Sequence, residues 1–390
     1  MQRRHFLRLV GGGIVVAAVG AGLSQVQVFG VPPGAVAAWR EAAAPTELRR
    51  WVLAHALLAP NPHNMQPWIA DLATEGEIVL RLDTARLLPA TDPYGRQILM
   101  GAGAFLELLA MAAAVRGHRA DIRLFPEGEP GEHLDGRPFA RVRLLAEPAA
   151  PRDPLFAQVL ARRTDRRAYD LARPPAAADI AAMHAAVDGL PVRFGVASSD
   201  EPARVQAIRA IARAAWRVEL TTEAPMMESV RVMRVGSREI DRHRDGITIT
   251  SPMVVALAWA GLFDRSRFPA ADGPEVKAQL DDFDVATAAT PAYLWLVTEG
   301  RSRGLQIAAG RAYARINLAG AQAGLAMHPN QQSLQEYPEV TQHYQAIHTL
   351  LDAPAPRFAV QMLARLGHLP AGVHAADPAP RRGLAALTGA

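Results

Sequence analysis

Four arginines and one hydroxyl side chain stand within six consecutive residues, Arg-Arg-Thr-Asp-Arg-Arg at 162–167. A guanidinium presents parallel N–H donors that match two oxygens of a phosphate, and the charge strengthens each of these hydrogen bonds. The run therefore predicts a site for a phosphate group. A solvated basic face on a surface helix would account for the same residues, so the spacing alone leaves both interpretations open.

A second segment with polar chemistry is the loop at residues 59–68, Ala-Pro-Asn-Pro-His-Asn-Met-Gln-Pro-Trp, which directly follows a predicted helix. Its prolines restrict the course of the chain. Asn64 and Gln66 are two residues apart, so in an extended loop their amides point the same way. Because an amide carries donors and an acceptor, this pair suits the edge of a flat polar heterocycle. The alternative is a helix C-terminal turn capped by its own side chains.

Two glycine-bounded helices repeat along the chain and would position these segments. Residues 103–117 and 310–324 share an apolar, small-residue pattern, and their first glycines are 207 positions apart. Each pattern is apolar on several faces, which predicts a buried helix. A looser pair of helices, 46–60 and 178–191, is offset by 132 positions. The second copy therefore carries about 75 extra residues, at roughly 217–290, as an insertion that suits either a lid or a helix pair that shapes a substrate site.

Several segments alternate like half-buried strands, which predicts an α+β fold. These segments are 77–83, 120–125, 141–145, 192–196 and 292–297. A joint rich in proline and alanine near 147–154 predicts a boundary between halves at 38–150 and 151–390.

Composition excludes several classes of protein. The chain has 390 residues and no cysteine, which excludes disulfide frameworks, iron–sulfur clusters and thiol nucleophiles. Its net charge is only +4, and three of those charges are Arg3, Arg4 and Arg8. Without them the protein is nearly neutral, so we expect no nucleic-acid partner. The 12 histidines show no ligand spacing, so we expect no metal site.

The first residues have the pattern of an export signal sequence. Arg3-Arg4 precede Phe6-Leu7 and an apolar run at 9–23, which resembles a twin-arginine export signal. An ordinary secretion signal or an uncleaved membrane anchor remains the alternative. Small residues offer cleavage sites at Ala18-Val19-Gly20 and at Ala35-Val36-Ala37. We expect a signal segment at 1–37, the twin-arginine translocase as a partner during export, and a periplasmic or other extracytoplasmic location.

Three motifs together resemble the FMN-dependent nitroreductase family. They are the opening Arg162-Arg163-Thr164-x-Arg166, the loop Ala59-Pro60-Asn61-x-x-Asn64-x-Gln66-Pro67-Trp68, and the tail Pro380-Arg381-Arg382. In that family the opening precedes the loop, whereas here it follows by about a hundred residues. The internal repeat explains this order if two halves are fused, as in the tandem Acg-type nitroreductases. The resemblance then implies an α+β, nitroreductase-like fold with two tandem halves forming a pseudo-dimer in one chain, and one complete site.

The resemblance also implies roles for particular residues. The FMN phosphate would be held by Arg162, Thr164 and Arg166, with Arg381 or Arg382 from the tail, while Arg163 would approach the ring or ribityl. The flavin would be lined by Pro62, His63, Asn64 and Gln66, and its reactive edge approached by Met327, His328 and Gln331. No catalytic side chain is required, because the flavin carries the chemistry.

The function that the resemblance implies is an exported FMN oxidoreductase. It would move hydride from NADPH, NADH or another donor to a nitro, quinone or similar small-molecule acceptor. The alternative is an FMN-sequestering or storage protein with a closed site and little turnover. A pseudo-dimeric monomer is expected in either case.

Overall fold

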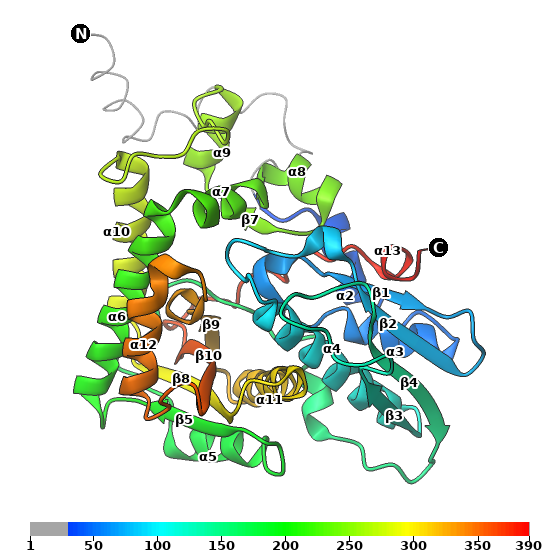
Figure 1. Cartoon of the computed structure of the whole chain (residues 1–390). Coiled ribbons are helices and arrows are strands. Elements are labelled where there is room, and N and C mark those ends of the chain that lie inside the picture. Colours follow the sequence, from blue (N-terminus) through cyan, green and yellow to red (C-terminus); the bar gives the residue numbers. More distant parts are fainter. Residues whose placement is uncertain (1–29, 390) are drawn as a thin grey trace.

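The computed structural model describes residues 30–389, so most of the predicted signal segment, residues 1–29, lies outside the described residues. Within the described part the chain forms two halves of mixed helix and sheet, capped by an insertion (Figure 1). The α+β class predicted from the sequence is confirmed.

The first half is built around one antiparallel sheet in the order β1-β2-β4-β3. Its elements are α3 (Leu48–Ala56), β1 (Trp68–Asp71), β2 (Glu77–Leu82), α4 (Arg96–Val115), β3 (His118–Leu124) and β4 (Pro138–Ala146). Helix α3 begins where the Glu47 carboxylate accepts hydrogen bonds from the backbone N–H groups of Arg49 and Arg50. The loop at residues 59–68 joins α3 to β1.

The second half repeats this plan with the order β5-β8-β10-β9. Its elements are α5 (Ala177–Ala185), β5 (Arg193–Ala197), α6 (Pro202–Thr221), β8 (Ala292–Glu299), α11 (Arg303–Gln322), β9 (Ala326–Pro329), α12 (Thr341–Leu350) and β10 (Phe358–Gly367). Strands β1, β2, β4 and β3 thus correspond in order to β5, β8, β10 and β9. In each half, one long buried helix joins the second strand of the sheet to its fourth.

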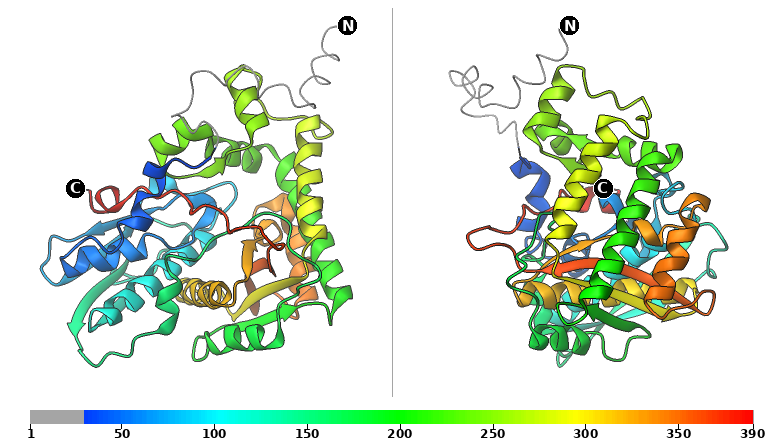
Figure 2. Two further views of the ribbon diagram at one scale, coloured as in Figure 1. Left: turned by 180° about the vertical axis from the view of Figure 1, so that it is seen from behind. Right: turned by 90° about the vertical axis from the view of Figure 1, so that its left-hand side faces the viewer.

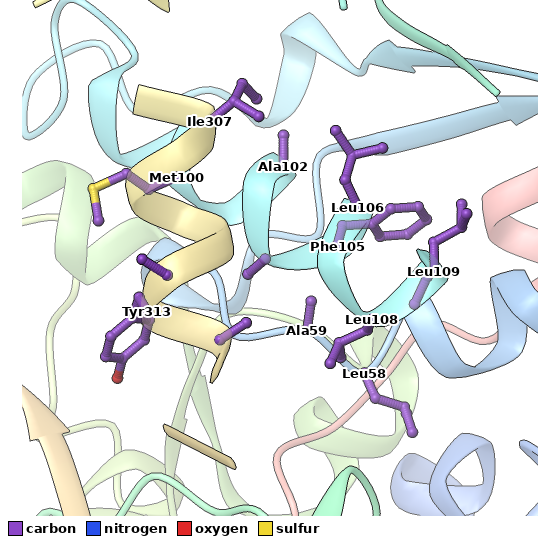
Figure 3. Packing of buried hydrophobic residues seen from close by; sticks show 14 of the residues in the cluster. Leu58, Ala59, Met100, Ala102, Phe105, Leu106, Leu108, Leu109, Ile307 and Tyr313 are labelled. Atoms are coloured by element: carbon purple, nitrogen blue, oxygen red, sulfur yellow. The ribbon is translucent and has the colours of Figure 1, made fainter. Parts of the chain in front are cut away.

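The two long helices cross at equivalent glycines. A Cβ on Gly103 would lie 2.0 Å from the carbonyl oxygen of Ile307, and one on Gly310 would lie 1.9 Å from that of Met100. Gly103 and Gly310 are 207 positions apart, and so are Met100 and Ile307. The crossing therefore has the reciprocal form of an interface between two like subunits. Figure 3 shows Met100 and Ile307 among the side chains around this crossing. Only glycine lets the two backbones approach this closely.

Helix α4 is the one candidate for a membrane span within the described residues, by length and apolar composition. However, 83% of its apolar window is buried inside the protein. It therefore has the burial expected of the central helix of a folded core.

The insertion lies between α6 and β8. It consists of α7 (Glu223–Arg231), β6 (Met233–Val235), α8 (Gly236–His243), β7 (Ile247–Ile249), α9 (Pro252–Trp259) and α10 (Pro274–Ala288). Strands β6 and β7 pair in parallel as a small separate sheet. Helices α7 to α9 lie above the two halves in Figure 1, while α10 runs down beside α6.

Both described ends of the chain lie on the first half. The N-terminal end forms η1 (Pro33–Val36) and α2 (Ala37–Arg40), and the C-terminal end forms α13 (Leu384–Thr388) beside β1. The tail after β10 crosses from the second half to the first, as the red segment in the left view of Figure 2 shows. Short 3-10 turns complete the chain at η2 (Pro62–Asn64), η3 (Thr84–Arg86), η4 (Pro154–Gln158), η5 (Gln332–Leu334) and η6 (Pro338–Val340).

Candidate functional site

The loop at residues 59–68 has an unusual backbone. His63, Asn64 and Gln66 all have positive φ, at 45°, 53° and 49°. Such conformations cost residues other than glycine about 1 kcal/mol or more each, and they persist where surrounding contacts hold them. One such contact is internal, because the Asn61 side-chain oxygen accepts a hydrogen bond of 2.8 Å from the Gln66 backbone N–H. Strain concentrated in one polar loop is typical of a segment that clamps a ligand.

The amides of Asn64 and Gln66 are engaged by the protein itself. Asn64 donates to the carbonyl oxygen of Pro380 at 3.0 Å and accepts from the Arg381 guanidinium at 2.7 Å. Gln66 donates to the carbonyl oxygen of Arg244 at 2.9 Å and accepts from the Arg382 backbone N–H at 2.9 Å. The structure thus brings the predicted loop and the predicted tail together, but these two amides hold the tail and the insertion. Their predicted contact with a flavin stays a prediction.

Three of the predicted arginines surround one aromatic ring. The guanidinium carbons of Arg162, Arg163 and Arg381 lie 5.6, 5.1 and 5.2 Å from the ring centroid of Trp39. Trp39 belongs to α2 and is 5% exposed. An indole face attracts cations, so it offsets part of the repulsion among them. We call Trp39, Arg162, Arg163 and Arg381 the Trp39 cluster.

The two innermost arginines of the Trp39 cluster are held by neutral groups. Arg162 donates to the carbonyl oxygen of Leu58 at 3.0 Å and to the Asn317 side chain at 3.2 Å. Arg381 donates to the carbonyl oxygens of residues 57–59 and to Asn64. No carboxylate in the described residues forms an ion pair with either one. Burial accordingly lowers the pKa of Arg162 to about 10 and also lowers the pKa of Arg381.

Arg166 belongs to a different group. Burial lowers the pKa of both His63 and His328, and the charge of Arg166 lowers each pKa further, although at His328 the charge of Arg365 has the larger effect of the two. His63 has a pKa of about 4, and both imidazoles are therefore neutral at pH 7. The Nδ1 atoms of both histidines are buried and have no hydrogen-bond partner within the described part of the chain. We call Arg166, His63 and His328 the Arg166 cluster.

The side chain of Arg166 is accessible to solvent although protein atoms surround it. Its side chain is exposed, yet burial alone lowers its pKa, and no hydrogen bond joins it to another described residue. Both properties hold when a guanidinium is reached by solvent but has many protein atoms around it. Gln331 adds a buried Oε1 without a partner, while its amide nitrogen contacts the sulfur of Met362. These unpartnered groups can meet the donors and acceptors of a planar polar ligand that carries a negative charge.

The remaining predicted residues have other surroundings. Thr164 is exposed and Pro62 is half-buried at the start of η2. Met327 is 1% exposed, and its sulfur accepts a contact of 3.1 Å from Asn317, so its side chain belongs to the core. Arg382 is half-buried, and the charges of Arg86 and Asp245 act on it.

The insertion attaches directly to the strained loop. The Gly246 backbone N–H donates to the carbonyl oxygen of Asn64 at 3.2 Å. Next to it, the buried Asp245 carboxylate pairs with Arg86 of the first half at 2.7 Å and with Arg234 of the insertion at 2.8 Å. Farther along, Glu228 accepts hydrogen bonds from the backbone N–H groups of residues 90 and 91. The insertion therefore covers the loop and is fastened to the first half.

Sequence reasoning missed Trp39, Asn317 and Arg365. Trp39 comes just after the predicted signal segment, where a lone aromatic residue among alanines gave only a weak signal. Asn317 lies on the buried helix α11 and holds Arg162. Arg365 of β10 pairs in register with His328 of β9 and is fully buried, but an arginine in an apolar strand has no local motif.

Comparisons with known proteins relate part of this chain to nitroreductases. No protein-family profile matches the chain. It is 37% identical over 120 residues to "Putative NAD(P)H nitroreductase acg" of Mycobacterium tuberculosis, which covers 31% of this chain and 34% of that protein. It is 35% identical over 143 residues to a second "Putative NAD(P)H nitroreductase" of the same organism, covering 36% and 39%. The chain thus spans a little over a third of the length of these curated relatives.

Solved structures of similar proteins were also compared. A nitroreductase with bound FMN from Bacteroides fragilis covers 59% of this chain and 96% of its own, with a TM-score of 0.37 and 13% identity. The FMN-dependent nitroreductase NfnB from Mycobacterium smegmatis, in complex with NADPH, covers 58% of this chain and 93% of its own, with a TM-score of 0.36 and 15% identity.

Proposed function

We propose that this protein binds FMN and is an oxidoreductase of the nitroreductase type, built as a pseudo-dimer of two nitroreductase-like halves. It would take electrons from NADPH, NADH or another donor and pass them to a nitro, quinone or similar small-molecule acceptor. The observation that carries the proposal is the Arg166 cluster. Its guanidinium has no hydrogen-bond partner among the described residues and lowers the pKa of both His63 and His328, whose buried Nδ1 atoms also lack partners there. The partial similarity to proteins named as NAD(P)H nitroreductases supports the same function.

The residues present fit FMN, because they offer positive charge and polar atoms that have no partner among the described residues. Arg166 would bind an anionic group of the cofactor, with the exposed Thr164 hydroxyl as a second donor. His63 and His328 would each offer one N–H donor and one acceptor nitrogen, since neither carries a proton on both nitrogens at pH 7. Arg162 and Arg381 would add positive potential through the protein. FMN itself would supply the electron-transfer chemistry when bound.

The test is a visible spectrum of the purified chain from residue 30 onward, before and after reconstitution with FMN. We expect a flavin spectrum that bleaches when NADPH is added without oxygen. Arg166→Ala should weaken FMN binding at least tenfold, since one charge-assisted contact contributes about 1.5–3 kcal/mol. Arg152→Ala changes an exposed arginine and serves as the matched control. Equal FMN affinity in both variants would rule out the assignment of Arg166.

The second candidate function is sequestering or storage of FMN with little turnover. It is favoured by the fastening of the insertion onto the strained loop through Asp245 and Gly246. If the wild-type flavin resists NADPH while Asp245→Ala bleaches, the insertion excludes the donor and storage is supported. If both bleach at the same rate, the oxidoreductase is supported.

We further propose that the protein is exported as a folded chain. Support comes only from Arg3-Arg4 and the apolar run after them. Replacing both arginines by lysine should retain the protein in the cytoplasmic fraction, whereas a Sec-type signal would tolerate that exchange. Light scattering on the purified protein tests the expected monomer.

A further inference from the structure

We call the first described residues, 30–42, the N-terminal segment. This segment contacts the C-terminal tail, the insertion and the arginine run at 162–167, all of which are far away in sequence. Ala35 is fully buried, and its carbonyl oxygen accepts a hydrogen bond of 2.9 Å from the Arg381 backbone N–H. Trp39 donates its indole N–H to the carbonyl oxygen of Ala379 at 2.8 Å. Gly34 approaches the insertion so closely that a Cβ there would lie 2.8 Å from a carboxylate oxygen of Asp241. The N-terminal segment is therefore packed against the C-terminal tail and the insertion together.

Trp39 is the part of this segment that touches the arginines. Its ring lies within 5.6 Å of three guanidinium carbons that come from positions 162, 163 and 381. Like charges crowded together repel one another strongly where water is excluded. The indole face attracts each of them and fills the space between them. Removing the indole ring would remove one of the contacts that hold Arg162 and Arg381 together.

We propose that the N-terminal segment is a permanent part of the arginine site, with Trp39 as its platform, and that any removal of the predicted leader ends before residue 30. A cut after Ala37 would detach Ala35 and break η1 from α2. Proteases act on accessible, extended chain, whereas Ala35 is buried in a helical turn. Of the two small-residue sites, the one at residues 35–37 is therefore incompatible with the fold. Residues 31–42 are excluded as a processing site.

The first experiment is the intact mass of the protein recovered from cells that express the full chain. A first residue at position 30 or earlier, including an uncut chain, supports the proposal. A first residue anywhere from 31 to 42 overturns it. This measurement needs neither FMN nor activity, so it is independent of the proposed function.

The second experiment compares chains that begin at residue 30 and at residue 38. The shorter chain loses the Ala35 contact, so its Tm should fall by at least about 5 °C, and limited proteolysis should release the C-terminal tail sooner. Equal Tm values and equal proteolysis would show that the first part of the segment is dispensable. Both readouts remain valid if the wild-type chain binds no FMN.

The role of Trp39 as a platform rests on the proposed FMN function and needs a matched pair of variants. Trp39→Phe and Trp51→Phe both shrink a buried tryptophan that lies against an arginine, but Trp51 contacts Arg116, outside the Trp39 cluster. We expect similar losses of Tm in both variants and a roughly tenfold weaker FMN affinity only in Trp39→Phe. Equal FMN affinities would overturn the platform role. A wild-type chain that binds no FMN would refute the proposed function and, with it, the platform role, while the first two experiments would still stand.

Discussion

The substitution Glu219→Gln should change how the stability of this protein depends on pH. Glu219 is 2% exposed near the end of α6, and its two carboxyl oxygens accept hydrogen bonds from Ser229 at 3.1 Å and Gln335 at 2.9 Å. Burial raises its pKa, the hydrogen bonds lower it and the nearby Glu228 carboxylate raises it, and the net result is a pKa of about 7 instead of 4.5. The one side-chain oxygen of Gln335 is buried and has no partner among the described residues, so turning that amide over would let it accept a hydrogen bond from a protonated Glu219.

The magnitude follows from proton linkage. Between pH 4.5 and about 7 the folded protein retains the Glu219 proton and the unfolded chain has lost it. Fewer protons on the unfolded chain mean that the free energy of unfolding falls as pH rises, by about 1.4 kcal/mol per pH unit in that window. The total loss by pH 7 is about 3 kcal/mol. Glutamine is neutral at every pH, so Glu219→Gln should lack this loss.

The assay is urea unfolding of wild type and variant at a series of pH values from 4.5 to 8. Burial also raises the pKa of Asp92, to about 6, so this carboxyl titrates in the same range. The difference between the free energies of unfolding of the two proteins isolates Glu219, because Asp92 and the buried histidines are present in both. We expect the variant to gain about 3 kcal/mol relative to wild type across this range. Glu223→Gln removes the same charge from an exposed side chain, so it controls for the loss of one negative charge without burial. A difference that stays flat with pH would show that Glu219 is already ionised in the folded protein and would refute the reasoning.

Two further predictions concern the helix crossing and the insertion. Gly310→Ala places a methyl group 1.9 Å from the Met100 carbonyl oxygen and should destabilise the protein by about 3 kcal/mol or more, measured by urea unfolding. Gly304→Ala, on the same helix with its nearest neighbour at 3.6 Å, should be almost neutral, and equal losses in both would contradict the close crossing. Asp245→Asn weakens the pairing with Arg86 and should speed hydrogen exchange across residues 223–288, by about tenfold or more. Unchanged exchange there would show that other contacts fasten the insertion.

The repeated helices and most of the strands could be predicted from local pattern. An apolar, small-residue run bounded by glycine has few alternatives to a buried helix, and 103–117 and 310–324 are indeed central helices. Alternating residues at 77–83 form β2 for the same local reason. The two repeated pairs of helices also made two halves predictable, since similar segments in the same order form similar sheets.

The composition of the candidate site could not be predicted in this way. Arg162 and Arg166 are near neighbours in sequence, yet one joins the Trp39 cluster and the other faces His63 and His328. The chain at 162–166 is irregular, so no helical or strand period sets which way successive side chains point. The motif therefore identified the residues but not their grouping.

Long-range contacts account for the rest. Asn64 meets Arg381 across more than three hundred residues, and Trp39 meets the same arginine. Residue types and spacing indicate what a side chain can bind, and here a polar loop, an arginine run and a basic tail were all recognisable. Which of them bind one another, and which stay open to a ligand, depends on how the halves, the tail and the insertion pack. That packing is set by the whole buried surface, and no local segment encodes it.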